Sequence, residues 1–173
     1  MSGEAAPFRG AEYHLDGHRV ARLAKREATL LGAEMARLDP WARLKISGAG
    51  LAATLSPVGD ASLYAPVSFG LYEPGEGGAL LGAVAIRPRF LNGPYLALLY
   101  VRPDCQSRGT GQAALSFMQM EAQKSGANGL WVSVSAFNSR AISFYRRFGF
   151  ADVGLVPGLI RDGEDEQLMR KAI

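Results

Sequence analysis

The sequence predicts one mixed α/β domain in which helices flank a central sheet. Two strand-like segments, 67–72 and 79–86, are separated by a turn rich in glycine, which is typical of a hairpin. Residues 95–101 are apolar at nearly every position, as expected for a central strand covered on both faces. A helical pattern over 109–125 and a strand-like alternation over 130–136 follow, so we expect a right-handed crossover to a parallel strand.

The N-terminal third contains the elements that are hardest to assign. Apolar spacing predicts a helix over 27–38, which Asp39-Pro40 ends, and a short alanine-rich helix over 49–55. Residues 11–26 could form a first strand or could already belong to the helix, and both interpretations stay open. Residues 1–10 are expected to form a disordered tail.

The C-terminal third combines one amphipathic helix with two closing strands. Asn138 is a suitable N-cap for the helix. Apolar residues then recur at helical spacing, at Ala141, Phe144, Tyr145 and Phe148. Strands are expected at about 150–160 and 166–172, separated by a polar turn.

Composition narrows the class of protein. The chain has 173 residues, 48% of them hydrophobic and 20% charged, which suits a single domain from residue 11 to 173. The net charge of +3 is spread along the chain without a basic block, so nucleic acid is not an expected partner. There is no apolar run of about 18 residues and no signal-peptide pattern, so we expect a cytoplasmic protein that does not bind a membrane.

The cysteine and histidine content argues against disulfides and metals. Cys105 is the single cysteine, which excludes an internal disulfide and a cysteine-rich metal site. No adjacent His or Lys activates Cys105 as a nucleophile. His14 and His18 without further ligands make a poor metal site, so no metal is expected.

The stretch 100–114 carries the strongest functional signal. Gly109 and Gly111 stand where a helix begins, and glycines there leave backbone N–H groups accessible to a phosphate. The pattern Gly109-x-Gly111-x-x-Ala114 partly matches the dinucleotide fingerprint. However, a polar loop separates it from the strand, and no acidic residue ends the next strand. No lysine follows the glycines, which excludes a P-loop, and an ordinary tight turn remains the alternative.

Two longer motifs resemble those of the GNAT N-acetyltransferase superfamily. The first, V-x-P-D-x-Q-x-x-G-x-G, runs from Val101 to Gly111 and resembles its acetyl-CoA-binding motif. The second, N-x-x-A-x-x-F-Y-x-x-x-G-F, runs from Asn138 to Phe150. Both occur in order, and the resemblance covers about residue 67 to the C-terminus. It implies an N-acetyltransferase with acetyl-CoA as cosubstrate and a primary amine, in a small molecule or a peptide, as acceptor.

The resemblance also implies a fold and a narrower group of relatives. The fold is a mixed, mostly antiparallel central sheet flanked by helices, with a splayed central strand pair. The late E-D-x-x-L-M-x-K segment, which starts at Glu164, and the early Pro40-Trp41 are loosely similar to ribosomal-protein alanine acetyltransferases. Dimers are common among such proteins, so a homodimer is an open expectation.

The cofactor contacts follow from the same resemblance. It implies a cradle for the pyrophosphate of coenzyme A made of Gln106, Ser107, Arg108, Gly109, Thr110, Gly111 and Gln112. The backbone of Leu99, Tyr100 and Val101 is expected along the pantetheine arm, where an amide can polarise the thioester carbonyl. Asn138 is expected to touch the same arm, although capping of its helix explains it equally well. Arg108 could equally be a solvated charge.

The reacting groups are only partly specified. Tyr145 is expected to protonate the departing thiolate as a general acid, although the apolar stripe of its helix could also account for it. A protonated amine must lose a proton before it attacks. The alanine-acetyltransferase relatives place a glutamate on the preceding strand, where this chain has Ser133. Glu73, Asp104 and Glu164 acting through water are the candidate substitutes, unless the amine arrives neutral.

Three residues are expected at the acceptor entrance, namely Trp41, Tyr72 and Ser133. Two other functions stay open. A protein that binds acetyl-CoA without turnover fits the missing glutamate, whereas the retained Tyr145 argues against it. A dinucleotide-binding protein fits only the short glycine pattern.

Overall fold

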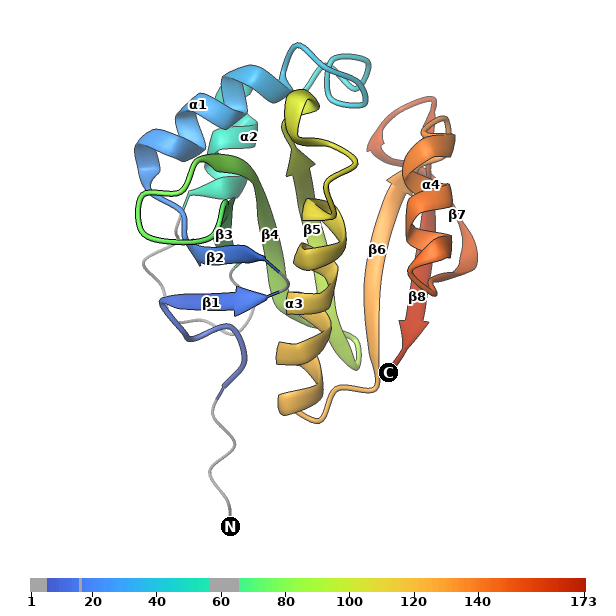
Figure 1. The fold of residues 1–173 in the computed structure, drawn as a ribbon. Coiled ribbons are helices and arrows are strands. Elements are labelled where there is room, and N and C mark those ends of the chain that lie inside the picture. Colours follow the sequence, from blue (N-terminus) through green and yellow to red (C-terminus); the bar gives the residue numbers. More distant parts are fainter. Residues whose placement is uncertain (1–5, 16, 57–65) are drawn as a thin grey trace.

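The computed structural model describes residues 6–15, 17–56 and 66–173, and they form an eight-stranded sheet with helices on both faces (Figure 1). The strands are β1 (Glu12–Leu15), β2 (His18–Arg22), β3 (Val67–Tyr72), β4 (Leu80–Phe90), β5 (Gly93–Val101), β6 (Gly129–Ser135), β7 (Ala151–Arg161) and β8 (Glu164–Ala172). Their order is β1-β2-β3-β4-β5-β6-β8-β7. Every neighbouring pair is antiparallel except β5 and β6. The predicted mixed, mostly antiparallel sheet is therefore confirmed.

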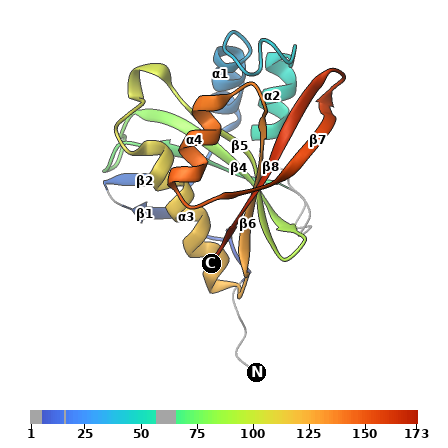
Figure 2. The ribbon, with the colours of Figure 1, turned by 90° about the vertical axis from the view of Figure 1, so that its right-hand side faces the viewer.

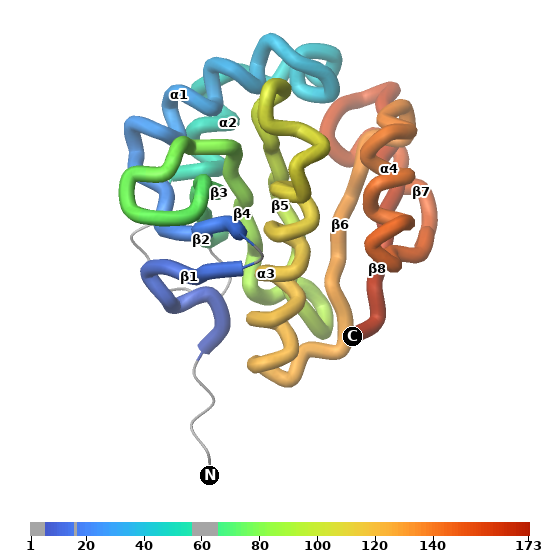
Figure 3. Tube along the Cα trace, in the orientation of Figure 1, coloured from blue at the N-terminus to red at the C-terminus, as the bar shows by residue number. Residues whose placement is uncertain are grey.

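The helices lie in two pairs on opposite faces of the sheet (Figure 2). They are α1 (Lys25–Met35), α2 (Gly48–Leu55), α3 (Thr110–Lys124) and α4 (Ser139–Arg147), with a short 3-10 turn, η1 (Pro103–Cys105), before α3. Figure 3 traces the chain from β5 through η1 into α3, which crosses the sheet before the chain returns as β6. In the described ranges, no helix is long and apolar enough to cross a membrane.

The two faces of β4 contribute to two separate cores. Val84 packs in the cluster that contains Phe117 of α3. Ala85, the next residue, packs in the cluster that contains Leu31 of α1. Because successive strand residues point to opposite faces, this alternation requires that β4 is covered on both sides. The strand β5 is covered on both sides as well, because Leu96 packs in the cluster of Phe117 and Leu98 packs in the cluster of Leu31. This confirms the central position predicted for β5.

The strands β5 and β6 separate after a short contact. Their register pairs Tyr95 with Trp131 and Leu96 with Val132, and no further pair follows. Against β4, Ile86 pairs with Leu96 and Ala85 pairs with Leu98, so Ala97 is the extra residue of a β-bulge. Beyond the bulge the two strands diverge, as Figure 1 shows. The splayed central pair implied by the resemblance is present.

The N-terminal region differs from the expected tail. Residues 1–5 lie outside the described residues, but Phe8 is fully buried. Its backbone N–H donates to Glu121 Oε2 at 2.7 Å, and Arg22 donates to its carbonyl oxygen at 2.6 Å. The prediction of disorder is therefore wrong for residues 6–10. A single phenylalanine in a polar stretch gave no sign that its partner lies 113 residues further along the chain.

Most predicted element boundaries agree with the structure within a few residues. Residues 11–26, for which the sequence leaves strand and helix both open, contain both: β1 and β2 form a hairpin, and α1 starts at Lys25. The predicted helix over 27–38 corresponds to α1, which ends earlier, at Met35. The predicted hairpin is confirmed as β3 and β4, with β4 extending to Phe90.

Candidate functional site

The predicted phosphate cradle lies at the start of α3. Ser107 (φ 63°) and Gly109 (φ 82°) both adopt left-handed backbone conformations, so the loop turns sharply into the helix. The first helical hydrogen bond runs from the Ala113 amide to the Gly109 carbonyl, at 2.9 Å. The amides of Thr110, Gly111 and Gln112 therefore have no acceptor within the helix. Amides of this kind, at the positive end of a helix dipole, can bind a phosphate.

The side chains of the loop have more specific positions than the sequence indicated. Gln106 Nε2 donates to the Val101 carbonyl at 3.2 Å, so Gln106 ties the loop to the end of β5. A Cβ on Gly111 would lie 3.1 Å from Phe144 Cζ, so this glycine allows α3 and α4 to approach closely. Ser107 and Arg108 are exposed. The structure thus brings residues 106–112 together, with backbone amides rather than the Gln106 side chain available to a ligand.

A histidine from β2 contacts this cradle. His18 Nε2 lies 3.1 Å from Thr110 Oγ1, and Thr110 is 1% exposed. The Thr110 hydroxyl therefore faces β2 rather than solvent. Sequence reasoning missed this pair because 92 residues separate its members and no motif links them.

The end of β5 presents its backbone beside the separated strands. Leu99, Tyr100 and Val101 lie beyond the last β5–β6 pair, so alternate backbone groups on that edge have no sheet partner. The Tyr100 side chain points instead into the α1–α2 core, where its hydroxyl donates to Glu34 at 3.3 Å. Burial, with Glu34 beside it, raises the pKa of Tyr100 to about 12. Trp41 packs edge-on against the Tyr100 ring, with centroids 5.7 Å apart.

Tyr145 lies in the core on the α3–α4 side. It is 8% exposed, and its ring packs edge-on against Phe144 and Phe150 at centroid distances of 5.2 and 5.6 Å. Burial raises the pKa of the Tyr145 phenol, and the nearby Tyr95 phenol acts in the same direction. Tyr145 therefore belongs to the apolar stripe and is also a phenol that stays protonated, so the structure is compatible with both interpretations. Asn138 caps α4 by accepting from the Ala141 amide at 3.1 Å.

Four polar side chains form a chain on the opposite face of β6 and β8. The Tyr95 and Ser133 hydroxyl oxygens are 2.7 Å apart. The Ser135 hydroxyl donates to Glu166 Oε1 at 2.6 Å. Glu166 is 4% exposed, and burial raises the pKa of its carboxyl, although hydrogen bonds from Ser135 and Ser133 act in the opposite direction. Sequence reasoning placed Glu166 at the start of the last strand and assigned it no role in the site.

The α1–α2 connection contacts the β7–β8 hairpin near the predicted acceptor entrance. Arg43 makes a two-pronged ion pair with Glu164, at 2.9 and 3.1 Å. Its guanidinium also lies over the Phe137 ring, 3.9 Å from the centroid. Arg161 Nη1 donates to the Arg43 carbonyl at 2.9 Å. Glu164, one of the candidate bases, is therefore held by an arginine.

Tyr72 lies away from the other residues predicted for the acceptor entrance. Its hydroxyl donates to Glu27 of α1 at 2.9 Å, and the Arg19 guanidinium lies 4.4 Å from its ring centroid. Its partners in the described chain lie on β2, β4 and α1. The strand alternation turns this side chain toward α1, where it contacts Glu27.

The remaining candidates are one buried thiol and two exposed carboxylates. Cys105 is 7% exposed, and burial raises the pKa of its thiol, which disfavours the nucleophilic thiolate. Glu73 and Asp104 are both exposed. Among the described residues, no group of three or more His, Cys, Asp or Glu side chains could hold a metal ion.

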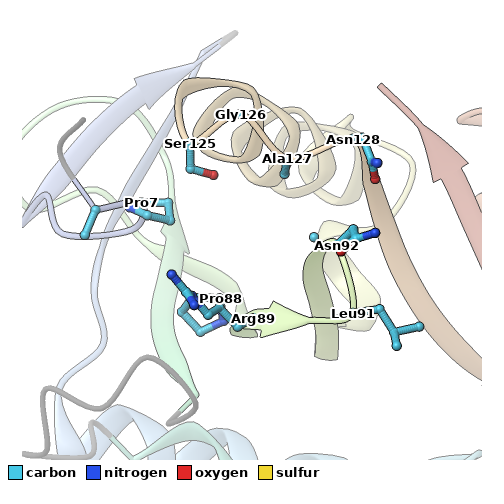
Figure 4. A pocket seen from close by; sticks show the side chains of 11 residues that line it. Pro7, Pro88, Arg89, Leu91, Asn92, Ser125, Gly126, Ala127 and Asn128 are labelled. Atoms are coloured by element: carbon cyan, nitrogen blue, oxygen red, sulfur yellow. The ribbon is translucent and has the colours of Figure 1, made fainter. Parts of the chain in front are cut away.

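One open hollow lies far from these residues (Figure 4). It has a volume of about 530 Å³ and lies between the C-terminal end of α3 and the β4–β5 connection. Arg89, Asn92 and Ser125 are among its lining residues, and no predicted site residue lines it. It is therefore separate from the candidate site.

Comparison with known proteins adds family information to this geometry. The family model for the acetyltransferase (GNAT) family matches residues 56–150, which contain the cradle, the separated strands and Tyr145. The [ribosomal protein bS18]-alanine N-acetyltransferase of Escherichia coli strain K12 is 37% identical over 70 residues, which are 40% of this chain and 47% of that protein. The chain thus spans about half the length of the curated relatives that it matches.

Solved structures share the fold. The ribosomal-protein-S18-alanine N-acetyltransferase of E. coli matches with a TM-score of 0.65 and 23% identity, over 90% of this chain and 94% of that chain. Nourseothricin acetyltransferase matches with a TM-score of 0.55 and 30% identity, over 62% of this chain and 65% of that chain. A Bacillus anthracis protein solved in complex with acetyl coenzyme A has a TM-score of 0.55 and 15% identity, over 62% of each chain.

Proposed function

Because this chain belongs to the acetyltransferase (GNAT) family, we propose that it is an N-acetyltransferase. It moves an acetyl group from acetyl-CoA to a primary amine by direct attack of the amine on the thioester. The separation of β5 from β6 carries this proposal, since it leaves an unpaired strand edge between the α3 cradle and Tyr145. The cytoplasmic location expected from the sequence is part of the same proposal.

The residues present fit coenzyme A. The amides of Thr110, Gly111 and Gln112 are without helical acceptors, and a Cβ on Gly109 would meet nothing within 4 Å, so the entrance to the cradle is open. These amides hold the pyrophosphate, and the exposed Ser107 and Arg108 can add contacts. The unpaired backbone of residues 99–101 holds the pantetheine amides. When bound, acetyl-CoA supplies the activated acetyl group.

Tyr145 acts as the general acid. A phenol whose pKa is raised by burial is protonated throughout the physiological range, so it is always available as a donor. The departing thiolate takes its proton. General acid catalysis of this kind contributes roughly 10²–10⁴-fold to a rate.

The acceptor enters on the α1–α2 face. Trp41 lies beside Tyr100 at the end of β5, and the Arg43–Glu164 contact closes the opposite rim. Ser133 lies between them on β6, bonded to Tyr95. Two relatives define the amines to test first, because one acetylates an alanine of a ribosomal protein and the other acetylates nourseothricin.

The proposal is tested with a panel of amines and two measurements. The panel contains a peptide with the N-terminal sequence of bS18, nourseothricin and a simple polyamine. Release of the CoA thiol measures turnover, and calorimetric titration with acetyl-CoA measures binding. We expect micromolar acetyl-CoA binding and turnover of at least one amine. Binding without turnover of any amine would instead support the non-catalytic binding protein, and absence of binding would contradict both.

A further inference from the structure

We propose that a relay from Tyr95 through Ser133 to Glu166 removes the proton from the acceptor amine, with Glu166 as the final proton acceptor. The inference rests on the proposed acetyltransferase function and adds the group that the sequence did not supply. Glu166 lies on β8, whereas the relatives' glutamate lies on the strand that carries Ser133 here.

The strand register places the members of this relay on one face. Ser135 and Glu166 are direct partners across β6 and β8, and Ser133 lies two residues before Ser135. Tyr95 is in register with Trp131, which also lies on that face of β6. Because strand side chains alternate with a period of two, all these side chains point to the same side of the sheet. Three neighbouring strands thus supply one continuous polar row.

Hydrogen-bonding groups follow one another along this row. The Ser135 hydroxyl donates to Glu166 Oε1 at 2.6 Å. Ser133 lies diagonally from Glu166 in the β6–β8 register, and both serines act to lower the pKa of the Glu166 carboxyl. Either hydroxyl can donate in the 2.7 Å contact between Tyr95 and Ser133. When Tyr95 donates, the single proton of the Ser133 hydroxyl is directed toward Glu166. A proton that arrives at the Tyr95 oxygen can therefore pass to Ser133 while the Ser133 proton moves to Glu166.

Glu166 has the environment of a base rather than of a structural ion pair. It is 4% exposed and has no ion-pair partner within residues 6–15, 17–56 and 66–173. A buried carboxylate without a counter-ion binds protons more tightly than one in water. Burial is the largest influence on the Glu166 pKa and raises it. A base with a raised pKa is better matched to an ammonium group than an ordinary carboxylate is.

The outer end of the relay reaches the proposed reaction site. Tyr95 belongs to the last residue pairs that join β5 to β6, immediately before the strands separate. Its phenol is close enough to Tyr145 to raise the pKa of the Tyr145 phenol. The general acid and the first group of the relay therefore meet at the separation, from opposite faces of the sheet.

The other carboxylates near this region are occupied. Glu164 is paired with Arg43 at 2.9 Å, and Glu34 is paired with Arg102 at 3.1 Å. Glu164 and Asp165 precede Glu166 on β8, and Tyr95 approaches Glu166 through Ser133. Arg161 of β7 adds no charge contact to Glu166, since it donates to the Arg43 carbonyl.

The reaction balances with these groups. The ammonium group gives one proton through Tyr95 and Ser133 to the Glu166 carboxylate. The neutral nitrogen then forms a bond to the acetyl carbonyl carbon, and the carbon–sulfur bond breaks. The thiolate takes the Tyr145 proton, and the second proton of the new ammonium centre returns to the Tyr145 phenolate. Glu166 finally releases its proton to solvent, so the products are the acetamide, CoA thiol and one proton.

The decisive variant is Glu166→Gln, because the amide keeps the shape and can still accept from Ser135. We expect kcat/KM for the best panel amine to fall roughly 10²-fold, with unchanged acetyl-CoA affinity by calorimetry. In the wild type, log kcat/KM falls as the pH falls through the Glu166 pKa, because the protonated carboxyl cannot accept a proton. That fall should disappear in Glu166→Gln. Glu121→Gln is the matched control, since Glu121 is also a buried carboxylate but holds the N-terminal segment.

Two further variants separate catalysis from structure. Ser133→Ala interrupts the relay, and its loss should not add to that of Glu166→Gln, because both remove the same path. The double variant Ser133→Glu with Glu166→Gln returns a carboxylate to β6 and should recover activity, which a merely structural role of Glu166 does not predict.

The outcomes also distinguish this inference from the proposed function. An active wild type with an equally active Glu166→Gln variant and an unchanged pH profile would overturn the relay alone. Equal loss in Glu166→Gln and in Glu121→Gln, without recovery in the double variant, would reduce Glu166 to a structural role. A wild type that turns over no amine would contradict the proposed function and the relay with it.

Discussion

The proposed cofactor side and the proposed acceptor side of this molecule are built in different ways. The cradle consists of seven consecutive residues, 106–112, which the turn at Ser107 and Gly109 folds around a helix end. The proposed acceptor side brings together residues from three separate segments: Trp41 and Arg43 of the α1–α2 connection, Ser133 of β6 and Glu166 of β8. A site made by one local turn tolerates change elsewhere in the chain. A site assembled from distant segments can lose or move a functional group, as the proposed shift of the base from position 133 to Glu166 would illustrate.

The largest effect is expected where the two sides meet, at Tyr145. Tyr145→Phe keeps the ring contacts with Phe144 and Phe150 and removes only the hydroxyl. We expect kcat to fall roughly 10²–10⁴-fold, because the general acid is lost, while acetyl-CoA binding and thermal stability stay close to the wild type. Steady-state kinetics with the best panel amine measures the effect. Unchanged kcat would assign Tyr145 to the core alone.

The next prediction tests whether acetyl-CoA binding depends on the turn at the start of α3 alone. Gly109→Ala places a side chain at φ 82°, which costs about 1–2 kcal/mol of stability, and we expect a several-fold higher KM for acetyl-CoA. Gly126 is the matched control at the other end of α3, with φ 68° and nothing within 4 Å of an added Cβ. Gly126→Ala should lower the melting temperature similarly and leave KM unchanged. An equal change in KM for both variants would contradict a local cradle.

A smaller effect distinguishes the two explanations for Asn138. Asn138→Ala removes the cap of α4 and should cost about 1 kcal/mol of stability. Ser47→Ala removes the equivalent cap of α2, where Ser47 accepts from Gly50 at 3.1 Å. If Asn138 also touches the cofactor, only Asn138→Ala raises the KM for acetyl-CoA. If both variants lose the same stability and neither changes the KM for acetyl-CoA, capping of α4 is the whole role of Asn138. Thermal melts and KM measurements on both variants decide.

The smallest effect on stability is expected at the acceptor rim. Arg43→Ala removes an ion pair in which the arginine side chain is half exposed, and such pairs contribute little to folding. We expect an almost unchanged melting temperature, a changed KM for the acceptor amine and an unchanged KM for acetyl-CoA. If Arg43→Ala changed the KM for acetyl-CoA and not that for the amine, the cofactor and acceptor sites would not be independent.

The local part of the site could be predicted from the sequence. Glycine positions, capping residues and helical spacing are local properties, so the cradle, the cap at Asn138 and the helix that carries Tyr145 were all identified. The hairpin of β3 and β4 and the central strand β5 follow from the same kind of pattern. Their roles in binding and catalysis remain predictions.

The long-range part could not be predicted. The contact of His18 with Thr110 and that of Phe8 with Glu121 join residues about a hundred positions apart, and no periodicity encodes them. Glu166 follows two acidic residues at a turn, so only the register of β8 against β6 shows that it faces Ser135. Tyr72 was misplaced for the same reason, since its partner Glu27 belongs to another element.

The short contact between β5 and β6 has a thermodynamic consequence. The five strands before α3 are joined to the three strands after it by two residue pairs between β5 and β6. A ligand that lies along the unpaired edge of β5 therefore occupies the place where neighbouring strands of the sheet share the fewest residue pairs. Its binding free energy adds to folding stability as RT ln(1 + [L]/Kd). The substrate would thus complete the sheet, and hydrogen exchange in β6 and β8 should slow when acetyl-CoA is added.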